Sequence, residues 1–161
     1  MNGPHQVGVQ DALAGLFHGG SANVSWEEAL RGLESELAYA VPPGLPHSVA
    51  DLVAHVQFWQ AYLLAVFRGE DPAWVQRAAD SWPEDQNPDW EALKAALFRD
   101  QDALAVYAQD EAFMQSVDPG ERTRLAPLTS FAGHGLYHLG QVVTVRHLLG
   151  AWPPPGGGDT W

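Results

Sequence analysis

The sequence predicts an all-α protein built as a four-helix bundle, and three observations support this. Strong strand patterns are sparse, four stretches each carry one apolar stripe at helical spacing, and prolines and glycines separate those stretches. Helices with a single apolar stripe bury it against one another, and four of them make a bundle. The 161 residues suit a single domain, with residues 1–20 as an N-terminal extension and residues 151–161 as an irregular tail.

The first bundle helix is expected over residues 25–40, in "SWEEALRGLESELAYA". Ser25 can cap its N-terminus, and Glu28 three positions later completes the pattern of a capping box. The prolines of "PPGLP" directly after it predict where it ends. Its expected apolar face consists of Leu30, Leu33 and Leu37. A weaker amphipathic stretch at residues 7–17 predicts an extra short helix in the N-terminal extension.

The second bundle helix opens at Ser48, with Asp51 as its acidic partner, and Gly69 and Pro72 close it. Its apolar residues alternate by four and three and therefore share one face: Leu52, Val56, Trp59, Leu63 and Val66. Residues 70–88 then form a connector that is long for a bundle loop. Because this connector carries two tryptophans, we expect it to pack onto the protein.

The third and fourth bundle helices are expected over residues 89–116 and 129–149, with the break "DPGERTRLAP" between them. The third has an apolar set at helical spacing: Trp90, Leu93, Leu97, Leu104 and Phe113. Gly150 and the following "WPPPGGGDTW" end the fourth helix and predict the irregular tail.

The charge of the chain disfavours two classes of partner. Its 8 basic and 20 acidic residues give a formal charge of −12. Nucleic-acid binding depends on Lys and Arg that neutralise phosphates, and an anionic membrane surface attracts the same residues. We therefore expect neither nucleic acid nor a membrane as a partner.

The absence of cysteine limits the chemistry further. Disulfides, thiolate metal sites and a cysteine nucleophile are excluded, so any metal must be held by His, Asp or Glu. The start of the chain lacks the basic region and apolar run of a signal peptide. We expect no stretch to reach the roughly 18 apolar residues of a membrane span, and we therefore expect a cytoplasmic protein.

Three of the seven histidines are expected to face the core. His134 and His138 lie on the apolar stripe of the fourth helix, one turn apart, so both imidazoles can reach one ion. His55 borders the apolar face of the second helix and can also point inward. The others are expected in helix ends or loops, solvated or as local caps (His5, His18 and His47), or off the helix stripe (His147).

These three histidines suggest a metal site, although the spacing alone also fits histidines that simply pack in a bundle. Three neutral imidazoles with open positions are a usual ligand set for a catalytic divalent ion, and burying them unpaired would be costly. The pattern is not that of zinc proteases, which need Glu where Gly135 stands. A di-iron bundle site is also disfavoured, because no Glu-x-x-His pair occurs.

Two long motifs resemble a known family. "GLPHSVADLVAHVQFWQAYLL" and, much later, "GHGLYHLGQVVTVRHLLGAWPP" are similar to the DinB-like (YfiT-type) superfamily of bacterial four-helix-bundle metalloenzymes. The most specific part is His-x-x-Tyr-His-x-Gly-Gln, which begins at His134. "SWP" at residues 81–83 is similar to a mid-chain signature of some members. The resemblance covers roughly residues 21–161.

The resemblance implies an up-up-down-down bundle with one divalent ion, zinc or nickel, on His55, His134 and His138. Characterised relatives include thiol-dependent S-transferases and a mycothiol-dependent isomerase. The family therefore implies metal-dependent transfer of a low-molecular-weight thiol to an electrophilic small molecule, in a protein that can form a homodimer. Two alternatives stay open, namely a metal-dependent hydrolase of the same fold and a non-catalytic metal- or small-molecule-binding protein of the stress response.

No catalytic residue can be assigned from the sequence, and three side chains are weak candidates. Gln141 is expected to hold a ligating imidazole or a substrate, or to fill a buried polar gap. Tyr137 is expected in the core with its hydroxyl satisfied. Arg146 is expected to be solvated or salt-bridged, with binding of a substrate carboxylate as the alternative.

Other positions near the histidines have two interpretations each. Asp51, one turn before His55, either orients its free ring nitrogen or only caps the helix. Gly133 and Gly135 stand where many relatives have Asp and Asn around the first histidine of the fourth helix. These glycines are expected either to allow close backbone packing or to open space beside the metal. Trp59 is expected in the core or as a pocket wall.

Overall fold

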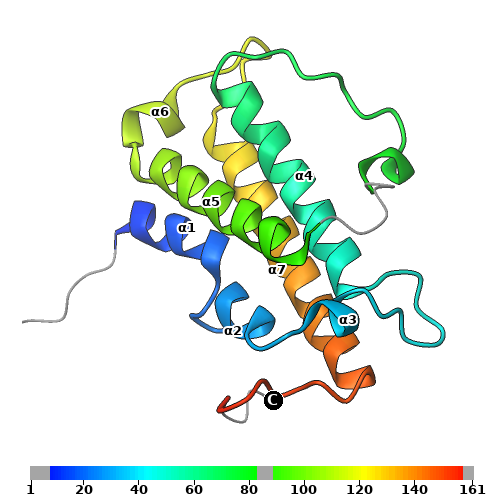
Figure 1. Ribbon diagram of the computed structural model, residues 1–161. Coiled ribbons are helices and arrows are strands. Elements are labelled where there is room, and N and C mark those ends of the chain that lie inside the picture. The colour runs from blue at the N-terminus through cyan, green and yellow to red at the C-terminus, as the bar shows by residue number, and fades with distance from the viewer. Residues whose placement is uncertain (1–7, 83–88, 158–161) are drawn as a thin grey trace, which may run out of the picture.

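The computed structural model describes residues 8–82 and 89–157, and these ranges are all-helical without a strand (Figure 1). Four helices are long: α1 (Val9–His18), α4 (Val49–Phe67), α5 (Trp90–Gln109) and α7 (Leu125–Leu148). Four others are short: α2 (Trp26–Leu30), α3 (Ser35–Ala38), α6 (Glu111–Gln115) and the 3-10 helix η1 (Ala78–Ser81). Residues 150–157 after α7 contain no helix, as predicted for the tail.

The four long helices pack as a closed ring. Helices α1 and α4 are not neighbours in this ring, and each packs against both α5 and α7 (Figure 1). The enclosed core has two apolar clusters. One contains Trp26, Val53, Leu97, Leu139 and Val142, and the other contains Phe17, Leu64, Leu104 and Leu128. Helix α1 therefore occupies a place in the bundle, although the sequence predicted it only as an extra helix.

Helices α4 and α5 run in the same direction. Near the middle of both, the amide nitrogen of Gln57 donates to the carboxylate of Asp100 at 2.9 Å. At their C-terminal ends, the rings of Phe67 and Tyr107 lie 5.2 Å apart. The predicted up-up-down-down order is therefore wrong, because it would make these two helices antiparallel. Helix α5 instead begins at the end of the bundle where α4 begins (Figure 1).

Helix α7 runs antiparallel to α4. Leu52 near the start of α4 and Val145 near the end of α7 line the same pocket. At the other end of the bundle, Val66 and Ala126 share a second pocket. This arrangement places the middle of α7 beside the middle of α4, where both helices carry histidines.

The helix predicted over residues 25–40 is two short helices. Gly32 adopts φ +65°, a left-handed conformation that ends helices and that other residues rarely adopt. A Cβ at this position would also lie only 3.0 Å from the Pro155 side chain of the tail. The apolar spacing continues through the break, which is why the sequence suggested one helix. The third predicted helix is also divided, because Asp110 leaves the helical conformation and caps α6.

The predicted helix starts at the two serines are confirmed. The Ser25 hydroxyl accepts a hydrogen bond from the Glu28 backbone N–H at 3.1 Å. Ser48 and Asp51 form a complete capping box, since the Ser48 hydroxyl accepts from Asp51 N–H at 3.1 Å and the Asp51 carboxylate accepts from Ser48 N–H at 2.8 Å. These contacts satisfy backbone donors that the first helical turn leaves free.

Helix α4 has the length and hydropathy of a membrane span, contrary to the expectation from the sequence. However, 56% of that stretch is buried inside the protein. Its apolar side chains contact α5 and α7, so α4 has the environment of a core helix.

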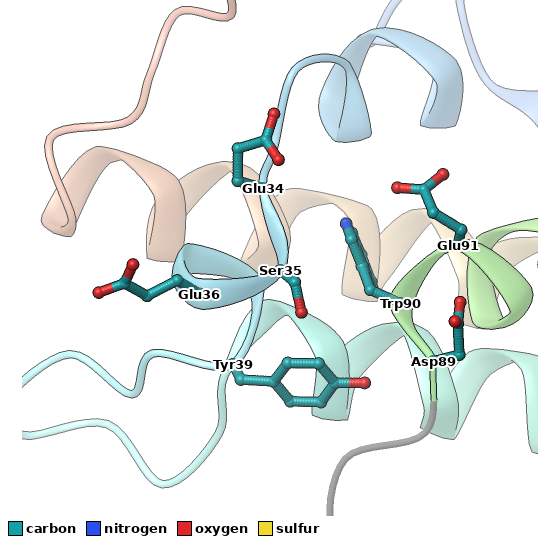
Figure 2. Close-up of a pocket in the computed structure, with 7 residues that line it drawn as sticks. All are labelled: Glu34, Ser35, Glu36, Tyr39, Asp89, Trp90 and Glu91. Atoms are coloured by element: carbon teal, nitrogen blue, oxygen red, sulfur yellow. The ribbon is translucent and has the colours of Figure 1, made fainter.

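The start of α5 is anchored to the segment between α2 and α3. The indole N–H of Trp90 donates to the Leu33 carbonyl at 2.8 Å, and the ring is buried. Figure 2 shows this indole between the chain at Glu34 and the first turn of α5. The adjoining surface pocket of about 570 Å³ is strongly acidic: it is lined by Glu34, Glu36, Asp89 and Glu91. One of these carboxylates, Asp89, caps α5 through the Ala92 N–H.

Two buried glutamines lie in the bundle core without full hydrogen bonding. Within the described residues, neither polar side-chain atom of Gln101 has a partner, and neither has the Gln60 carbonyl oxygen. Burying such atoms destabilises a fold. We expect Gln101→Met to raise the free energy of unfolding by about 1–2 kcal/mol, measured by urea denaturation. The control is Gln57→Met, which removes the bond to Asp100 and should not stabilise; a loss of stability in Gln101→Met would contradict the prediction.

Candidate metal centre

The structure brings the three predicted histidines together between α4 and α7. The Nε2 atom of His134 lies 3.2 Å from Nε2 of His55 and 3.0 Å from Nε2 of His138. His134 and His138 are one turn apart on α7, and His55 faces them from α4. His55 and His138 are buried, and His134 is partly buried. In the described part of the chain, no Asp, Glu or further His joins this group.

The ring of His55 is held in place by the connector that follows α4. Its Nδ1 lies 2.9 Å from the backbone carbonyl oxygen of Ser81. A carbonyl oxygen can only accept, so Nδ1 carries the proton and Nε2 presents a lone pair to the other histidines. The Trp82 indole stacks on the same imidazole, with centroids 4.0 Å apart and planes 10° from parallel.

The ring of His138 is held by its own helix. Its Nδ1 lies 2.6 Å from Oε1 of Gln141, and the amide nitrogen of Gln141 donates to the Tyr137 hydroxyl at 3.3 Å. The amide oxygen is an acceptor, so Nδ1 of His138 also carries the proton. Its Nε2 is therefore free to act as a ligand. Hydrogen bonds of this type to the second ring nitrogen are typical of metal-binding histidines.

The three converging nitrogen atoms could hold a cation between them. Nε2 of His55 and Nε2 of His138 each present a lone pair to Nε2 of His134. One proton on His134 can bond only one of them, so the other contact brings two nitrogen atoms together without a proton. Burial lowers the pKa of all three imidazoles. The effect is largest for His134, where burial and the neighbouring His138 and His55 lower the pKa to about 4. At neutral pH the group is therefore uncharged.

A divalent ion fits this arrangement. Zn²⁺ binds imidazole nitrogen at about 2.0 Å, and a tetrahedral ion separates its nitrogen ligands by roughly 3.3 Å. The two Nε2–Nε2 separations of 3.2 and 3.0 Å are close to that value. Three neutral imidazoles suit zinc and nickel alike, so the geometry supports a divalent ion without selecting one.

A pocket of about 460 Å³ opens beside His138. Its walls are mainly apolar, with polar groups at one side; they include Leu45, Leu52, Val145, Tyr137 and Gln141. His47 and Trp82 also line it, and their rings stack with centroids 3.7 Å apart. A concave apolar site with a few polar groups is typical for small-molecule binding.

Three positions differ from the sequence predictions, and at Asp51 the structure shows one of the two predicted roles. His47 was expected to be solvated or to act as a cap, but it stacks on Trp82. Tyr137 was expected in the core, but it is 65% exposed because it points from α7 toward the pocket mouth. Arg146 was expected to be solvated or salt-bridged, but it is buried and bonded to backbone carbonyls. Asp51 caps α4, and the Ser81 carbonyl takes the role of orienting His55.

His18, Gly133 and Gly135 have no direct role in the three-histidine group. His5 lies outside the described residues, and His18 approaches Asp102 at 3.4 Å on the surface. Gly133 is exposed, and a Cβ there would meet nothing within 4 Å. Gly135 is buried, but a Cβ would only reach ordinary contact with Trp26 at 4.0 Å. No close approach therefore requires glycine at either position.

Two groups of the site were not predicted from the sequence, namely the Ser81 carbonyl and the Trp82 ring. A backbone carbonyl carries no signature of residue type, so its role was not visible in the sequence. The "SWP" motif at residues 81–83 marks this segment, and its first two residues are the ones that contact His55.

The contact between Gln141 and His138 leads to a prediction. Gln141→Leu removes the acceptor that fixes the His138 ring, and loss of such partners typically weakens metal binding 10- to 100-fold. We expect a loss of about that size in zinc affinity, measured by competition with a chromophoric chelator. Thr144→Ala is the matched control, because its hydroxyl bonds only the Gly140 carbonyl. Equal affinities of Gln141→Leu and the wild type would contradict the assigned role.

Comparison with known proteins places the chain in a family. The family model of the DinB superfamily matches residues 24–142, well over half of the chain. The match includes all three histidines and Gln141. No curated protein and no solved structure matches the chain in the same comparisons. Since the match spans α2 to α7 and contains the three-histidine site, the protein belongs to the DinB superfamily.

Proposed function

We propose that the protein is a metal-dependent enzyme that transfers a low-molecular-weight thiol to an electrophilic small molecule. The observation that carries the proposal is the convergence of three neutral imidazole nitrogens beside an apolar pocket. Among the described residues no fourth side chain closes the group, which favours an open site over a purely structural one. The divalent ion, zinc or nickel, would be held by His55, His134 and His138.

The chain has the parts that such a reaction requires. When bound, a divalent ion lowers the pKa of a thiol or water and so supplies a nucleophile near neutral pH. The Ser81 carbonyl and the Gln141 amide orient two of the imidazoles. Trp82 covers one face of His55 and lines the pocket, so it limits access of water from that side. The apolar walls of the pocket beside His138 suit the uncharged part of a bound small molecule.

With a chloroarene as electrophile, the transfer is a balanced substitution. The thiol gives up its proton to solvent, its sulfur forms a bond to the ring carbon, and chloride leaves with the bonding electron pair. The products are a thioether, chloride and a proton. No oxidant or reductant takes part, which agrees with a chain that has no cysteine for redox chemistry.

The test is a cosubstrate screen with the metal-loaded protein. Bacillithiol, mycothiol and glutathione are each incubated with 1-chloro-2,4-dinitrobenzene, and the conjugate is followed by absorbance. We expect a metal-dependent rate with at least one thiol, and its loss in the His134→Ala/His138→Ala double variant. His147→Ala removes a histidine on the exposed side of the same helix and should keep the rate. Absence of a metal-dependent conjugate with every thiol would refute the proposal.

A further inference from the structure

A second pocket lies on the other side of the histidines from the one beside His138. It has a volume of about 570 Å³ and lies at the end of the bundle where α4 ends and α7 begins. The two pockets share no lining residue. Its lining includes four aromatic side chains and two arginines: Tyr62, Phe67, Trp74, Phe131, Arg122 and Arg124. We call it the aromatic pocket.

The inner wall of the aromatic pocket is one helical turn from the histidines. Phe131 lines the pocket and precedes His134 by three residues on α7. Trp59 follows His55 by four residues on α4, and its ring lies 6.0 Å from that of Phe131. Residues three or four apart share a helix face, so Trp59 and Phe131 each lie one turn from a histidine, on the same faces of α4 and α7. A molecule against Phe131 would therefore lie about one helical turn from the histidines.

The pocket carries positive charge in a chain that is acidic overall. The chain has only 8 basic residues against 20 acidic ones, and two of the 8 line this pocket. Arg122 is paired with Asp118, which also lines the pocket, at 3.5 Å. The Asp118 carboxylate is further engaged by the backbone N–H groups of Gly120 and Arg122, at 2.8 and 3.0 Å. The two arginines and this carboxylate leave one net positive charge.

Because Arg122 is paired with Asp118, Arg124 is the pocket arginine that can bind an anionic ligand. Its guanidinium lies over the Phe113 ring, 4.6 Å from the centroid. Within residues 8–82 and 89–157 no carboxylate pairs with it. A guanidinium stacked by its face keeps the N–H groups of its edge free, and that edge matches the two oxygens of a carboxylate.

We propose that the aromatic pocket binds an aromatic carboxylate, with its ring against Tyr62 and Trp74 and its carboxylate on Arg124. Resting on the proposed function, this assigns the pocket to the electrophilic substrate and makes that substrate an anion. In a chain with a formal charge of −12, a local unpaired cation is needed to admit an anionic ligand. The stacked ring and the bidentate contact together would distinguish a carboxylate from its neutral analogue.

The test uses a matched pair of ligands, 2-naphthoate and the neutral 2-naphthamide, in calorimetric titrations of the full-length protein. We expect wild-type protein to bind naphthoate about tenfold more tightly than naphthamide. Arg124→Gln should remove that preference while the affinity for naphthamide stays the same. Trp74→Ala should weaken binding of both ligands. Arg99→Gln changes the charge equally but lies outside the pocket, so it should leave both affinities unchanged.

Several outcomes would overturn the assignment: no naphthoate binding, no preference for naphthoate, or the same preference in Arg124→Gln. Binding is measured a second time in His138→Ala, where it should persist because the pocket does not include that residue. This separates the two proposals. Arg124-dependent naphthoate binding without any thiol conjugation would refute the proposed function alone. Conjugation together with Arg124-independent binding would refute the aromatic pocket alone.

Discussion

Replacing His138 with alanine is expected to abolish stoichiometric metal binding and the thermal stabilisation that metal provides. A ligand that binds only the folded state stabilises it by about 4 kcal/mol at a concentration 1,000 times its dissociation constant. For a chain of this size such a gain raises Tm by roughly 10 °C. In the variant, only His55 and His134 remain of the group, and two imidazoles without further protein ligands hold zinc weakly.

The measurement is elemental analysis after dialysis, combined with calorimetric scans with and without zinc. The matched control is His147→Ala, which removes an exposed histidine from the same helix and should retain one metal ion per chain. The wild-type protein treated with a chelator should show the Tm of its metal-free form, and zinc should restore the higher value. Equal metal content in His138→Ala and His147→Ala would refute the three-histidine site.

Replacing Arg146 with methionine is expected to lower the free energy of unfolding by about 3 kcal/mol. Arg146 is 2% exposed, and its guanidinium donates to the carbonyl oxygens of Ala29 at 2.6 Å, Arg31 at 3.2 Å and Ala151 at 3.0 Å. Burial lowers its pKa, but an arginine stays charged at neutral pH. The variant would leave these acceptors without their donor, while the methionine chain still fills most of the volume.

Urea denaturation of Arg146→Met against wild type measures this loss. Arg31→Met is the control, because the Arg31 side chain is 46% exposed and its ion pair with Glu28 is a surface contact worth less than about 1 kcal/mol. Arg146→Lys should recover little, since one ammonium group cannot reach carbonyls in three separate places. A change in stability below about 0.5 kcal/mol in Arg146→Met would contradict the structural role.

The sequence predicted those parts of the fold that depend on local chemistry. The capping serines Ser25 and Ser48 mark helix starts because the bonds involved lie within four residues. The break at Gly32 escaped prediction because Leu30 and Leu33 continue a helical pattern across it. The direction of α5 could not be predicted either, since it depends on where the chain between α4 and α5 places the start of α5 and not on any local pattern.

At the site, too, features set by local sequence were predicted and features set by distant segments were not. Helical register placed His134 and His138 on one face, and the structure has them there. Arg146 was misjudged because a charged residue is usually exposed unless it is paired, and its partners are backbone carbonyls that come from distant segments. The stacking of His47 on Trp82 could not be foreseen, because it joins two loops whose paths the sequence does not specify.

The contact of the Ser81 carbonyl with His55 restricts the number of residues in the connector between α4 and Ser81. Loops usually tolerate insertions, but this one carries an atom that fixes a ring 26 positions earlier in the chain. One residue added between Phe67 and Ser81 would shift that oxygen by up to about 3.5 Å, beyond hydrogen-bonding range. Among related chains, this segment should therefore vary in composition more freely than in length.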